Sequence, residues 1–398
     1  MIAPYIKDLI SSKTASAIRK MFEAGLILKA KYGEDNVYDF SIGNPDLDPP
    51  EKVLNAIRTV AQDTGHGVHG YMPNAGYKTV RAAMARKESG QQGVDIDFSS
   101  IVMTVGAAAA ITSVLKALLS PGDEVVVPVP YFAEYSHYVH NHGGKLVEVK
   151  TNEDFSIDAE AIAAALNEKT AAVIINSPNN PTGKIYSKDD LEKLTSVLDA
   201  HGKKTGRYPY LICDEPYRAI VYDGKEVPAI FPLYKYAVVV TSFAKNLSIP
   251  GERIGYICAN PANPEKDEFI SAATFATRIL GFVNAPAFFQ KVVELSWDAD
   301  CDYSSYETRC RELTKVLDNA GLKYARPEGA FYIFCKVPEC WGDDDQGFVE
   351  VLEKNLVLCA PGTSFGMKGY FRIAYCVSEK TIINSKDAFY AAAHTPKA

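Results

Sequence analysis

A lysine that follows a run of apolar residues has the clearest chemical potential in this sequence. Lys245 comes after Val238-Val239-Val240, with the hydroxyl of Ser242 three positions before it and the guanidinium of Arg253 eight positions after it. A lysine that loses its proton in a desolvated or cation-rich site can attack a carbonyl and form an imine. The three groups together suit a cofactor with an aldehyde and a phosphate, which is pyridoxal phosphate. A single lysine after a strand is more often exposed, so the interpretation depends on its companions.

Asp214 and Tyr217 supply two further groups that this cofactor needs. Asp214 follows the apolar Leu211-Ile212-Cys213, at the expected C-terminal edge of a strand, where open α/β sheets bind ligands. A carboxylate there can keep a pyridine nitrogen protonated, which makes the ring an electron sink. Tyr217 can place its phenol against the ring hydroxyl. Taken alone, such an aspartate is more often a helix N-cap.

Three other segments offer contacts to the same cofactor. Asn180, in Asn180-Pro181-Thr182-Gly183, carries an amide that can donate to the ring oxygen. The small residues Ala107 and Ala108 let the backbone N–H groups of a helix start reach a phosphate, and Phe132 can stack on the ring. An ordinary turn, a plain helix start and a core aromatic are the structural alternatives.

Arg372 is the candidate for substrate binding. It stands inside the apolar run Tyr370-Phe371-Arg372-Ile373-Ala374-Tyr375. A buried arginine needs an anion, and its planar guanidinium matches an α-carboxylate with two hydrogen bonds. A structural salt bridge explains the residue equally well.

Length, composition and charge bound the remaining possibilities. The chain has 398 residues, enough for two domains, and its 47% hydrophobic and 23% charged residues are typical of a globular enzyme. A net charge of −7 argues against nucleic acid and anionic membrane as partners. No stretch has the length and apolarity of a signal peptide or a membrane span, so we expect a cytoplasmic protein.

Neither the cysteines nor the histidines predict a metal site. The eight cysteines include no Cys-x-x-Cys pair, which favours buried reduced thiols. His137, His140 and His142 are close in sequence but have no acidic or thiol partner at metal-ligand spacing. We expect them to have structural or surface roles.

Apolar runs that alternate with amphipathic stretches over residues 95–260 predict a mostly parallel sheet crossed by helices. The expected strands are 101–105, 124–129, 145–149, 172–176, 210–213, 237–242 and 254–258, with helices over 135–142, 158–166 and 188–201. A long helical region over 282–319 then leads to strands at 329–334 and 370–375 and a helix after Gln346. The fold class is therefore α/β, with a large domain over 44–285 and a smaller α+β domain formed by 1–43 and 286–398.

The ordered set of motifs resembles the class I/II aminotransferases of pyridoxal phosphate fold type I, the aspartate aminotransferase superfamily, over about residues 35 to 380. The motifs are Ser41-x-Gly43-Asn44-Pro45, Gly70-Tyr71-x-Pro73-x-x-Gly76, Asn180-Pro181-Thr182-Gly183, Asp214-x-x-Tyr217, Ser242-x-x-Lys245, Arg253-x-Gly255 and Arg372.

The resemblance implies a role for each matching residue. Lys245, Asp214 and Tyr217 would be catalytic, as the imine-forming lysine, the pyridinium partner and a ring-hydroxyl contact shared with Asn180. The cofactor phosphate would be held by Ala107, Ala108, Ser242 and Arg253, and the substrate carboxylate by Gly43, Asn180 and Arg372. Tyr71 would reach the phosphate of a neighbouring subunit, which implies a homodimer with shared active sites.

Two departures from the family pattern concern phosphate binding and specificity. Ala244 stands where many members have a second hydroxyl before the lysine. Ala108 stands where bacterial aspartate-specific relatives often have a lysine for the distal carboxylate, which counts against aspartate specificity. Tyr5, Ile18 and Phe22 are candidates to line the side-chain pocket, or to pack as an ordinary helix.

The predicted activity is ping-pong amino transfer between an L-amino acid and a 2-oxo acid. A carbon–sulfur β-lyase on the same fold is the nearest alternative, because the same cofactor chemistry can expel a β-substituent. A non-catalytic, ligand-sensing regulator is a third, although the sequence has no basic DNA-binding extension.

Overall fold

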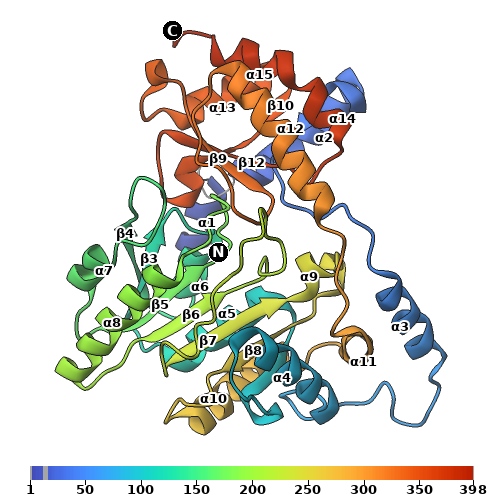
Figure 1. Cartoon of the computed structure of the whole chain (residues 1–398), viewed down its shortest axis with the longest axis vertical. Helices are drawn as coiled ribbons and strands as arrows, with labels where there is room; N and C mark the ends of the chain where they lie inside the picture. Colours follow the sequence, from blue (N-terminus) through green and yellow to red (C-terminus); the bar gives the residue numbers. More distant parts are fainter. Residues whose placement is uncertain (1, 12–16, 398) are drawn as a thin grey trace.

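A seven-stranded sheet forms the centre of the larger part of the molecule (Figure 1). The computed structural model describes residues 2–11 and 17–397. The strand order is β2-β8-β7-β6-β5-β3-β4, and β8 alone runs antiparallel to its neighbours. The strands are β2 (Ile101–Thr104), β3 (Glu124–Val129), β4 (Lys145–Lys150), β5 (Thr170–Asn176), β6 (Tyr210–Asp214), β7 (Ala237–Ser242) and β8 (Gly255–Ala259). The predicted α/β fold class is confirmed, and all seven predicted strands form with ends shifted by two residues at most.

Helices cover both faces of this sheet. Successive side chains of a strand point to opposite faces, so each strand contributes to the cores on both sides. Val238 and Val240 of β7 share a core with the first group of helices, whereas Val239 shares a core with the second. The first group is α5 (Gly106–Leu118), α6 (Glu134–His140) and α10 (Lys266–Ile279). The second is α3 (Glu51–Gln62), α4 (Lys78–Gln92), α7 (Ala159–Ala165), α8 (Lys188–Thr205) and α11 (Ala287–Ser296). Both sides of the sheet are thus buried, which explains its continuous apolar runs.

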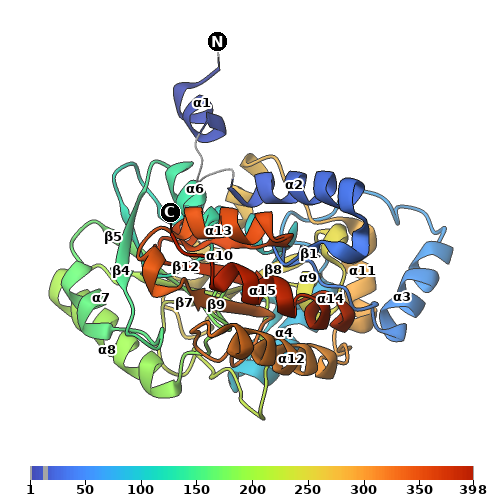
Figure 2. The same cartoon turned by 90° about the horizontal axis from the view of Figure 1, so that it is seen from above.

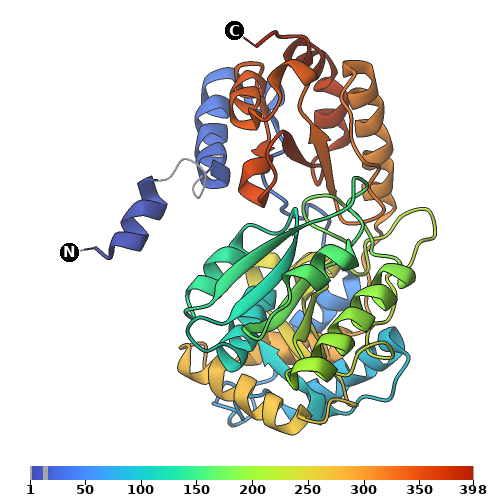
Figure 3. The same ribbon diagram turned by 90° about the vertical axis from the view of Figure 1, so that its left-hand side faces the viewer.

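The C-terminal region and the N-terminal segment build a second, smaller part (Figure 1 and Figure 3). Its antiparallel sheet has the order β11-β12-β9, and a short parallel pair joins β1 to β10. Met21, Val37 and Phe40 lie in the same core as the C-terminal helices. The elements are α2 (Ala17–Tyr32), β1 (Tyr38–Asp39), α12 (Ser304–Ala320), β9 (Tyr332–Lys336), α13 (Asp345–Lys354), β10 (Val357–Leu358), β11 (Ala360–Pro361), β12 (Tyr370–Ala374), α14 (Glu379–Asn384) and α15 (Lys386–Ala393).

The first helix, α1 (Pro4–Ser11), projects from the larger part of the molecule in Figure 2. It contacts α6, since the rings of Tyr5 and His140 stack with centroids 3.8 Å apart. The Tyr5 hydroxyl also lies 3.1 Å from Nδ1 of His137. These contacts give two of the clustered histidines a structural role, as predicted.

The predicted helical region over 282–319 is wrong as a single unit. The helices α11 and α12 are separated at Trp297–Tyr303, a segment that contains three aspartates. Aspartate side chains compete with a helix for backbone N–H groups, and Oδ1 of Asp302 accepts from the Ser304 backbone N–H at 3.0 Å. The strand predicted at 329–334 also starts later, at Tyr332, because Gly329 makes only an isolated bridge with Val221 and Ala330 and Phe331 form a turn with positive φ at Ala330.

The domain boundaries at 43/44 and 285/286 stay a prediction. Val292 and Val293 of α11 lie in a core of the large sheet, while Tyr306 of α12 lies in the second core.

Six cysteines are buried free thiols, as expected, whereas Cys340 is exposed and Cys301 is partly exposed. In the described part of the chain, no helix combines the length and apolarity needed to cross a bilayer.

Candidate active site

The predicted cofactor residues converge because the strands that precede them run in one direction. β2 and β7 are both antiparallel to β8, so β2 points the same way as β7, β6, β5 and β3. Their C-terminal ends therefore share one edge of the sheet, the usual position of ligands in open α/β folds. The residues that follow or end these strands at this edge are Ala107, Ala108, Phe132, Asn180, Asp214, Tyr217, Ser242 and Lys245.

A cavity of about 180 Å³, here called the inner cavity, lies at this edge. All eight of these residues and Arg253 line it, together with Ile111, Tyr138, Asn176, Pro216, Ala244 and Pro250. The sequence did not predict that the polar side chains of Tyr138 and Asn176 would line this cavity. Asn176 is the last residue of β5, so its place at the end of a predicted strand could have marked it. Tyr138 lies in the short helix α6, where nothing in the sequence distinguishes it.

Lys245 lies on the short helix α9 (Phe243–Asn246), directly after β7. Its Nζ donates to the carbonyl of Gly43 at 2.7 Å. Burial, with a smaller contribution from the cations Arg372 and Arg253, lowers the pKa of Lys245 from 10.5 to about 8. The amine can therefore lose its proton near neutral pH, as a nucleophilic lysine must.

Asp214 ends β6 as a buried carboxylate with one free oxygen. Its Oδ2 accepts from the Tyr135 hydroxyl at 2.5 Å, whereas Oδ1 is buried without a partner. Burial, with a smaller contribution from the neighbouring carboxylate of Glu215, raises the pKa of Asp214 from 3.8 to about 7. The Nδ2 group of Asn176 donates to the backbone carbonyl of Asp214 at 2.7 Å and fixes the end of β6. A ligand that places a cationic donor at Oδ1 would be strongly favoured here.

The start of α5 and Arg253 form a site for an anion. Helix α5 begins at Gly106, and a Cβ at that position would lie 3.0 Å from Nη2 of Arg253. Glycine, at a φ of +80°, thus permits the guanidinium to approach the helix N-terminus. Free N–H groups and the helix dipole favour a phosphate there, and the buried side chain of Ser242 lines the same cavity.

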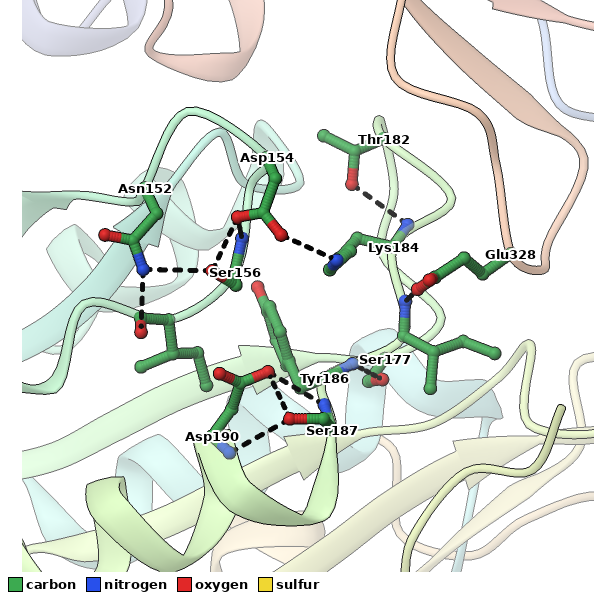
Figure 4. Close-up of polar contacts among 12 residues, drawn as sticks. Asn152, Asp154, Ser156, Ser177, Thr182, Lys184, Tyr186, Ser187, Asp190 and Glu328 are labelled. Atoms are coloured by element: carbon green, nitrogen blue, oxygen red, sulfur yellow. Dashed lines mark hydrogen bonds and ion pairs between the residues drawn. The ribbon is translucent and has the colours of Figure 1, made fainter.

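The loop that carries Asn180 is tied to both parts of the molecule, through contacts of the segment after it that Figure 4 shows at Lys184 and Glu328. On one side, Nζ of Lys184 contacts Asp154 at 3.0 Å. On the other, Glu328 accepts from the Ile185 backbone N–H at 2.9 Å. The loop itself is closed by Asn179, whose side chain accepts from the backbone and hydroxyl of Thr182. The position of Asn180 therefore depends on contacts far apart in the sequence.

A second cavity of about 670 Å³, here called the outer cavity, adjoins the first. Phe132, Asn180, Tyr217 and Lys245 line both. The other lining residues of the outer cavity are Ile42, Gly43, Tyr131, Ala133, Glu134, Ser136, His137, Glu148, Tyr332, Thr363, Ser364, Gly366 and Arg372. The substrate candidates Gly43 and Arg372 are thus brought to the cavity that opens beside Lys245.

Arg372 is 4% exposed and only partly satisfied by the protein. Its Nη1 donates to Oδ1 of Asn180 at 3.2 Å and its Nη2 to the carbonyl of Ser41 at 2.6 Å, whereas Nε has no partner. The guanidinium stacks on Tyr332 and Phe365 at 4.8 and 4.9 Å from the ring centroids. Its hydrogen-bond partners among the described residues are an amide and a backbone carbonyl rather than a carboxylate, which counts against the structural salt bridge given as the alternative.

Tyr332 is the main lining residue that sequence reasoning missed. Its hydroxyl lies 2.9 Å from that of Tyr217, and burial raises its pKa to about 12. It comes from β9, where a tyrosine in an apolar strand has no local mark of function.

Tyr71, in contrast, is 96% exposed and lies outside both cavities of its own chain. Tyr5 lines neither cavity, and the side chains of Ile18 and Phe22 lie outside the described residues.

Comparison with known proteins agrees with this arrangement. The model of the family "Aminotransferase class I and II" matches residues 35–387. The aspartate/prephenate aminotransferase of Thermus thermophilus is 32% identical over 358 residues, which cover 87% of this chain and 88% of that protein. The aromatic-amino-acid aminotransferase 2 of Thermococcus litoralis is 30% identical, with 96% of each chain covered.

Solved structures give the same result. An aminotransferase from Eubacterium rectale superposes with a TM-score of 0.94 at 38% identity, with 98% of each chain covered. The aspartate aminotransferase of Thermus thermophilus with maleate superposes with a TM-score of 0.85 at 28% identity, covering 98% and 99% of the two chains. The α/β fold and these structural neighbours thus define a transferase of fold type I. This chain belongs to the class I and II aminotransferases, and the predicted family and enzyme class are confirmed.

Proposed function

We propose that this aminotransferase binds pyridoxal phosphate in the inner cavity, binds its amino acid and 2-oxo acid in the outer cavity, and works as a homodimer. Lys245, which lines both cavities and has a pKa lowered to about 8, is the observation that carries the proposal. The relatives named above support amino transfer, and nothing specific favours the β-lyase or the regulator.

The residues of the inner cavity fit this cofactor at each of its polar groups. The unpartnered Oδ1 of Asp214 suits a protonated ring nitrogen. The start of α5, Ser242 and Arg253 suit the phosphate, and Asn180 and Tyr217 suit the ring hydroxyl. Phe132 offers an aromatic face for stacking. Ala244 contributes no hydroxyl, so Ser242 is the side-chain hydroxyl in this segment that we assign to the phosphate.

When bound, pyridoxal phosphate supplies an aldehyde carbon that accepts an amine and a cationic ring that withdraws electrons from the substrate. The chain's own residues do the rest. Asp214 stays ionised opposite the ring nitrogen, since a facing cation lowers a pKa that burial alone raises. Arg372 holds the α-carboxylate with the donors that the protein leaves free, and Gly43 lies beside it. Lys245 then carries the proton that leaves the substrate's α-carbon.

Tyr71 supports the proposed homodimer. A tyrosine that is 96% exposed in its own chain is free to reach the phosphate site of a neighbouring subunit. Sedimentation of the purified protein should therefore give a dimer, and Tyr71→Phe should weaken the affinity for pyridoxal phosphate. A cytoplasmic location stays a prediction.

Reconstitution with pyridoxal phosphate, followed by addition of an L-amino acid, tests the function directly. We expect cofactor absorbance that shifts when the amino acid is added and shifts back when a 2-oxo acid follows. Lys245→Ala should lower turnover by at least about 10⁴-fold, because it removes both the amine and the proton carrier.

Lys204→Ala is the matched control, since Lys204 is an exposed lysine on α8 that lines neither cavity. It should leave turnover unchanged. Release of ammonia and an oxo acid without any acceptor would replace amino transfer by the lyase activity. Failure to take up the cofactor at all would overturn the proposal.

A further inference from the structure

We propose that Tyr332 is a positioning residue for both cavities, with one task for its hydroxyl and another for its ring. The hydroxyl orients Tyr217 toward the cofactor, and the ring holds the guanidinium of Arg372 in place for the substrate carboxylate. This inference rests on the proposed function, because that function assigns Tyr217 and Arg372 to those two groups. Tyr332 is 2% exposed and makes its contacts inside one chain, so a neighbouring subunit leaves them in place.

The hydroxyl groups of Tyr332 and Tyr217 form a buried pair. Their oxygens are 2.9 Å apart, and the two rings meet edge to face with centroids 5.6 Å apart. Burial raises the pKa of Tyr332 to about 12 and also raises the pKa of Tyr217, so both phenols keep their protons at neutral pH. Each hydroxyl can therefore donate one hydrogen bond and accept others.

The single proton of the Tyr217 hydroxyl gives the pair a direction when the cofactor is bound. A phenol that donates to the ring oxygen of the cofactor has no second proton to give, so its bond with Tyr332 must be one that it accepts. Tyr332 then donates to Tyr217 and fixes the rotation of that hydroxyl. A hydroxyl that accepts a hydrogen bond is also a stronger donor, because successive hydrogen bonds polarise one another. The Tyr332 hydroxyl should therefore strengthen the contact between Tyr217 and the cofactor.

The ring of Tyr332 faces the guanidinium of Arg372. Tyr332 pairs with Ala374 across the antiparallel strands β9 and β12, which makes Arg372 its diagonal neighbour on the same face of the sheet. Diagonal neighbours are within reach of aromatic and long side chains, and Cζ of Arg372 lies 4.8 Å from the ring centroid. Phe365 contacts the same guanidinium at 4.9 Å. An aromatic face attracts the cation and leaves the edge of the planar guanidinium free to hold a carboxylate.

Gly43 makes room for this arrangement. A Cβ at Gly43 would collide with the hydroxyl of Tyr332 and would lie 2.7 Å from Cε1 and Cζ of its ring. The carbonyl of the same glycine accepts from Nζ of Lys245 at 2.7 Å. The missing side chain at Gly43 thus lets Tyr332 stand beside the segment that contacts the reactive lysine, which supports a role for Tyr332 in the site.

Titration of the cofactor-free protein with pyridoxal phosphate, followed by absorbance, tests the task of the hydroxyl. Tyr332→Phe keeps the ring and removes the hydroxyl. We expect it to weaken the affinity for pyridoxal phosphate roughly three- to tenfold, the range of one hydrogen bond, and to leave KM for the amino acid unchanged. The stoichiometry of each titration gives the folded fraction, so partial unfolding does not mimic a weaker affinity.

Aliphatic variants test the task of the ring. Tyr332→Leu removes both the hydroxyl and the aromatic face. It should weaken cofactor affinity as Tyr332→Phe does and should also raise KM for the amino acid roughly fivefold, because Arg372 loses a buried cation–π contact. Tyr332→Met loses the same two groups with an unbranched side chain and should give the same result.

A double-mutant cycle separates positioning from packing. Tyr217→Phe removes the hydroxyl through which Tyr332 acts, so Tyr332→Phe should cost no further cofactor affinity in that background, whereas independent packing losses would add. Tyr234→Phe is the control, because its buried hydroxyl donates to the Pro209 carbonyl at 2.8 Å and the residue lines neither cavity. This control should change neither cofactor affinity nor KM.

The possible results distinguish the two tasks from each other and from the proposed function. Wild-type cofactor affinity in Tyr332→Phe, or additive losses in the double variant, would overturn the role of the hydroxyl. A KM in both aliphatic variants equal to that of Tyr332→Phe would rule out the role of the ring. A wild-type protein that takes up no pyridoxal phosphate would contradict the proposed function instead.

Discussion

The two cavities differ in the way that the chain builds them. The inner cavity is lined mainly by residues at the ends of parallel strands of one sheet, such as Asp214 after β6 and Lys245 after β7. The outer cavity combines that edge with Gly43 from the N-terminal segment, Tyr332 from β9 and Arg372 from β12. We therefore assign the reaction chemistry to residues at the edge of the large sheet. We assign the choice of substrate to the outer cavity, where that edge lies against residues of the smaller part.

The two cavities also differ in charge. The inner cavity joins a free carboxylate oxygen at Asp214 to an anion site at Arg253, a complement to a cofactor with a cationic ring and a phosphate. The outer cavity is lined by two cations, Lys245 and Arg372, and by two carboxylates, Glu134 and Glu148. Changes in the first should therefore affect every amino acid alike, whereas changes in the second should affect substrates differently.

Asp214→Asn should produce the largest effect of the substitutions that keep Lys245. We expect turnover to fall by about 10²- to 10⁴-fold with every amino acid, because the ring nitrogen loses its anion. The cofactor-free variant should meanwhile be more stable than the wild type above pH 7. The buried carboxylate has a pKa raised to about 7, so it binds a proton between its unfolded pKa near 4 and 7, and the free energy of unfolding falls as pH rises through that window.

Single-turnover kinetics and urea unfolding at pH 8 check both halves of this prediction. Near-normal turnover in Asp214→Asn would remove Asp214 from the proposed mechanism. A loss confined to some amino acids would contradict the separation between the two cavities.

Arg372→Lys should affect substrate binding alone. It keeps the charge but loses the planar fork that holds a carboxylate with two hydrogen bonds. We expect kcat/KM for the amino acid to fall roughly 10- to 100-fold, the range for lost hydrogen bonds to a charged group, with unchanged cofactor affinity. Arg326→Lys, in the exposed pair with Asp223, is the control and should behave as the wild type. Weakened cofactor binding in Arg372→Lys would show that the cavities are not independent.

The pH dependence of cofactor uptake sharpens the assignment of Lys245. Only the neutral amine attacks a carbonyl, and a pKa of about 8 leaves roughly a tenth of it neutral at pH 7 and nine tenths at pH 9. The rate of uptake of pyridoxal phosphate, followed by absorbance, should therefore rise about tenfold between these values. A rise that begins only near pH 10, the range of an ordinary lysine, would contradict the effect of burial.

Glu328→Ala should give the smallest effect on activity, and this effect should extend to the binding of both cofactor and amino acid. It leaves the backbone N–H of Ile185 without its partner and loosens the loop that carries Asn180. We expect the free energy of unfolding to fall by about 1 kcal/mol, with a modest rise in KM for both cofactor and amino acid. Glu339→Ala breaks an exposed ion pair with Lys323 and should change neither. Equal effects of the two substitutions in urea unfolding would count against the anchoring role of Glu328.

Much of the inner cavity was predictable from the sequence because the residues predicted to line it each have a local signal. Asp214 follows an apolar strand, Asn180 lies in a proline-rich turn, and Ser242 and Lys245 follow another strand. Once the strands run parallel, these ends must meet at one edge. Tyr135, which donates to Asp214, had no such signal, since its partner is 79 positions away and its own helix looks ordinary.

The sequence by itself determined the alternation of strands and helices, the family and the residues that suit the cofactor. These depend on short-range periodicity and on side-chain chemistry, which are written in consecutive residues. Only the tertiary structure decided that Lys245 is desolvated, that Arg372 finds Asn180 and Ser41 rather than a carboxylate, and that Glu134 and Glu148 line the outer cavity. Burial and charge at a site are sums over segments far apart in the chain, so they arise only when folding brings those segments together.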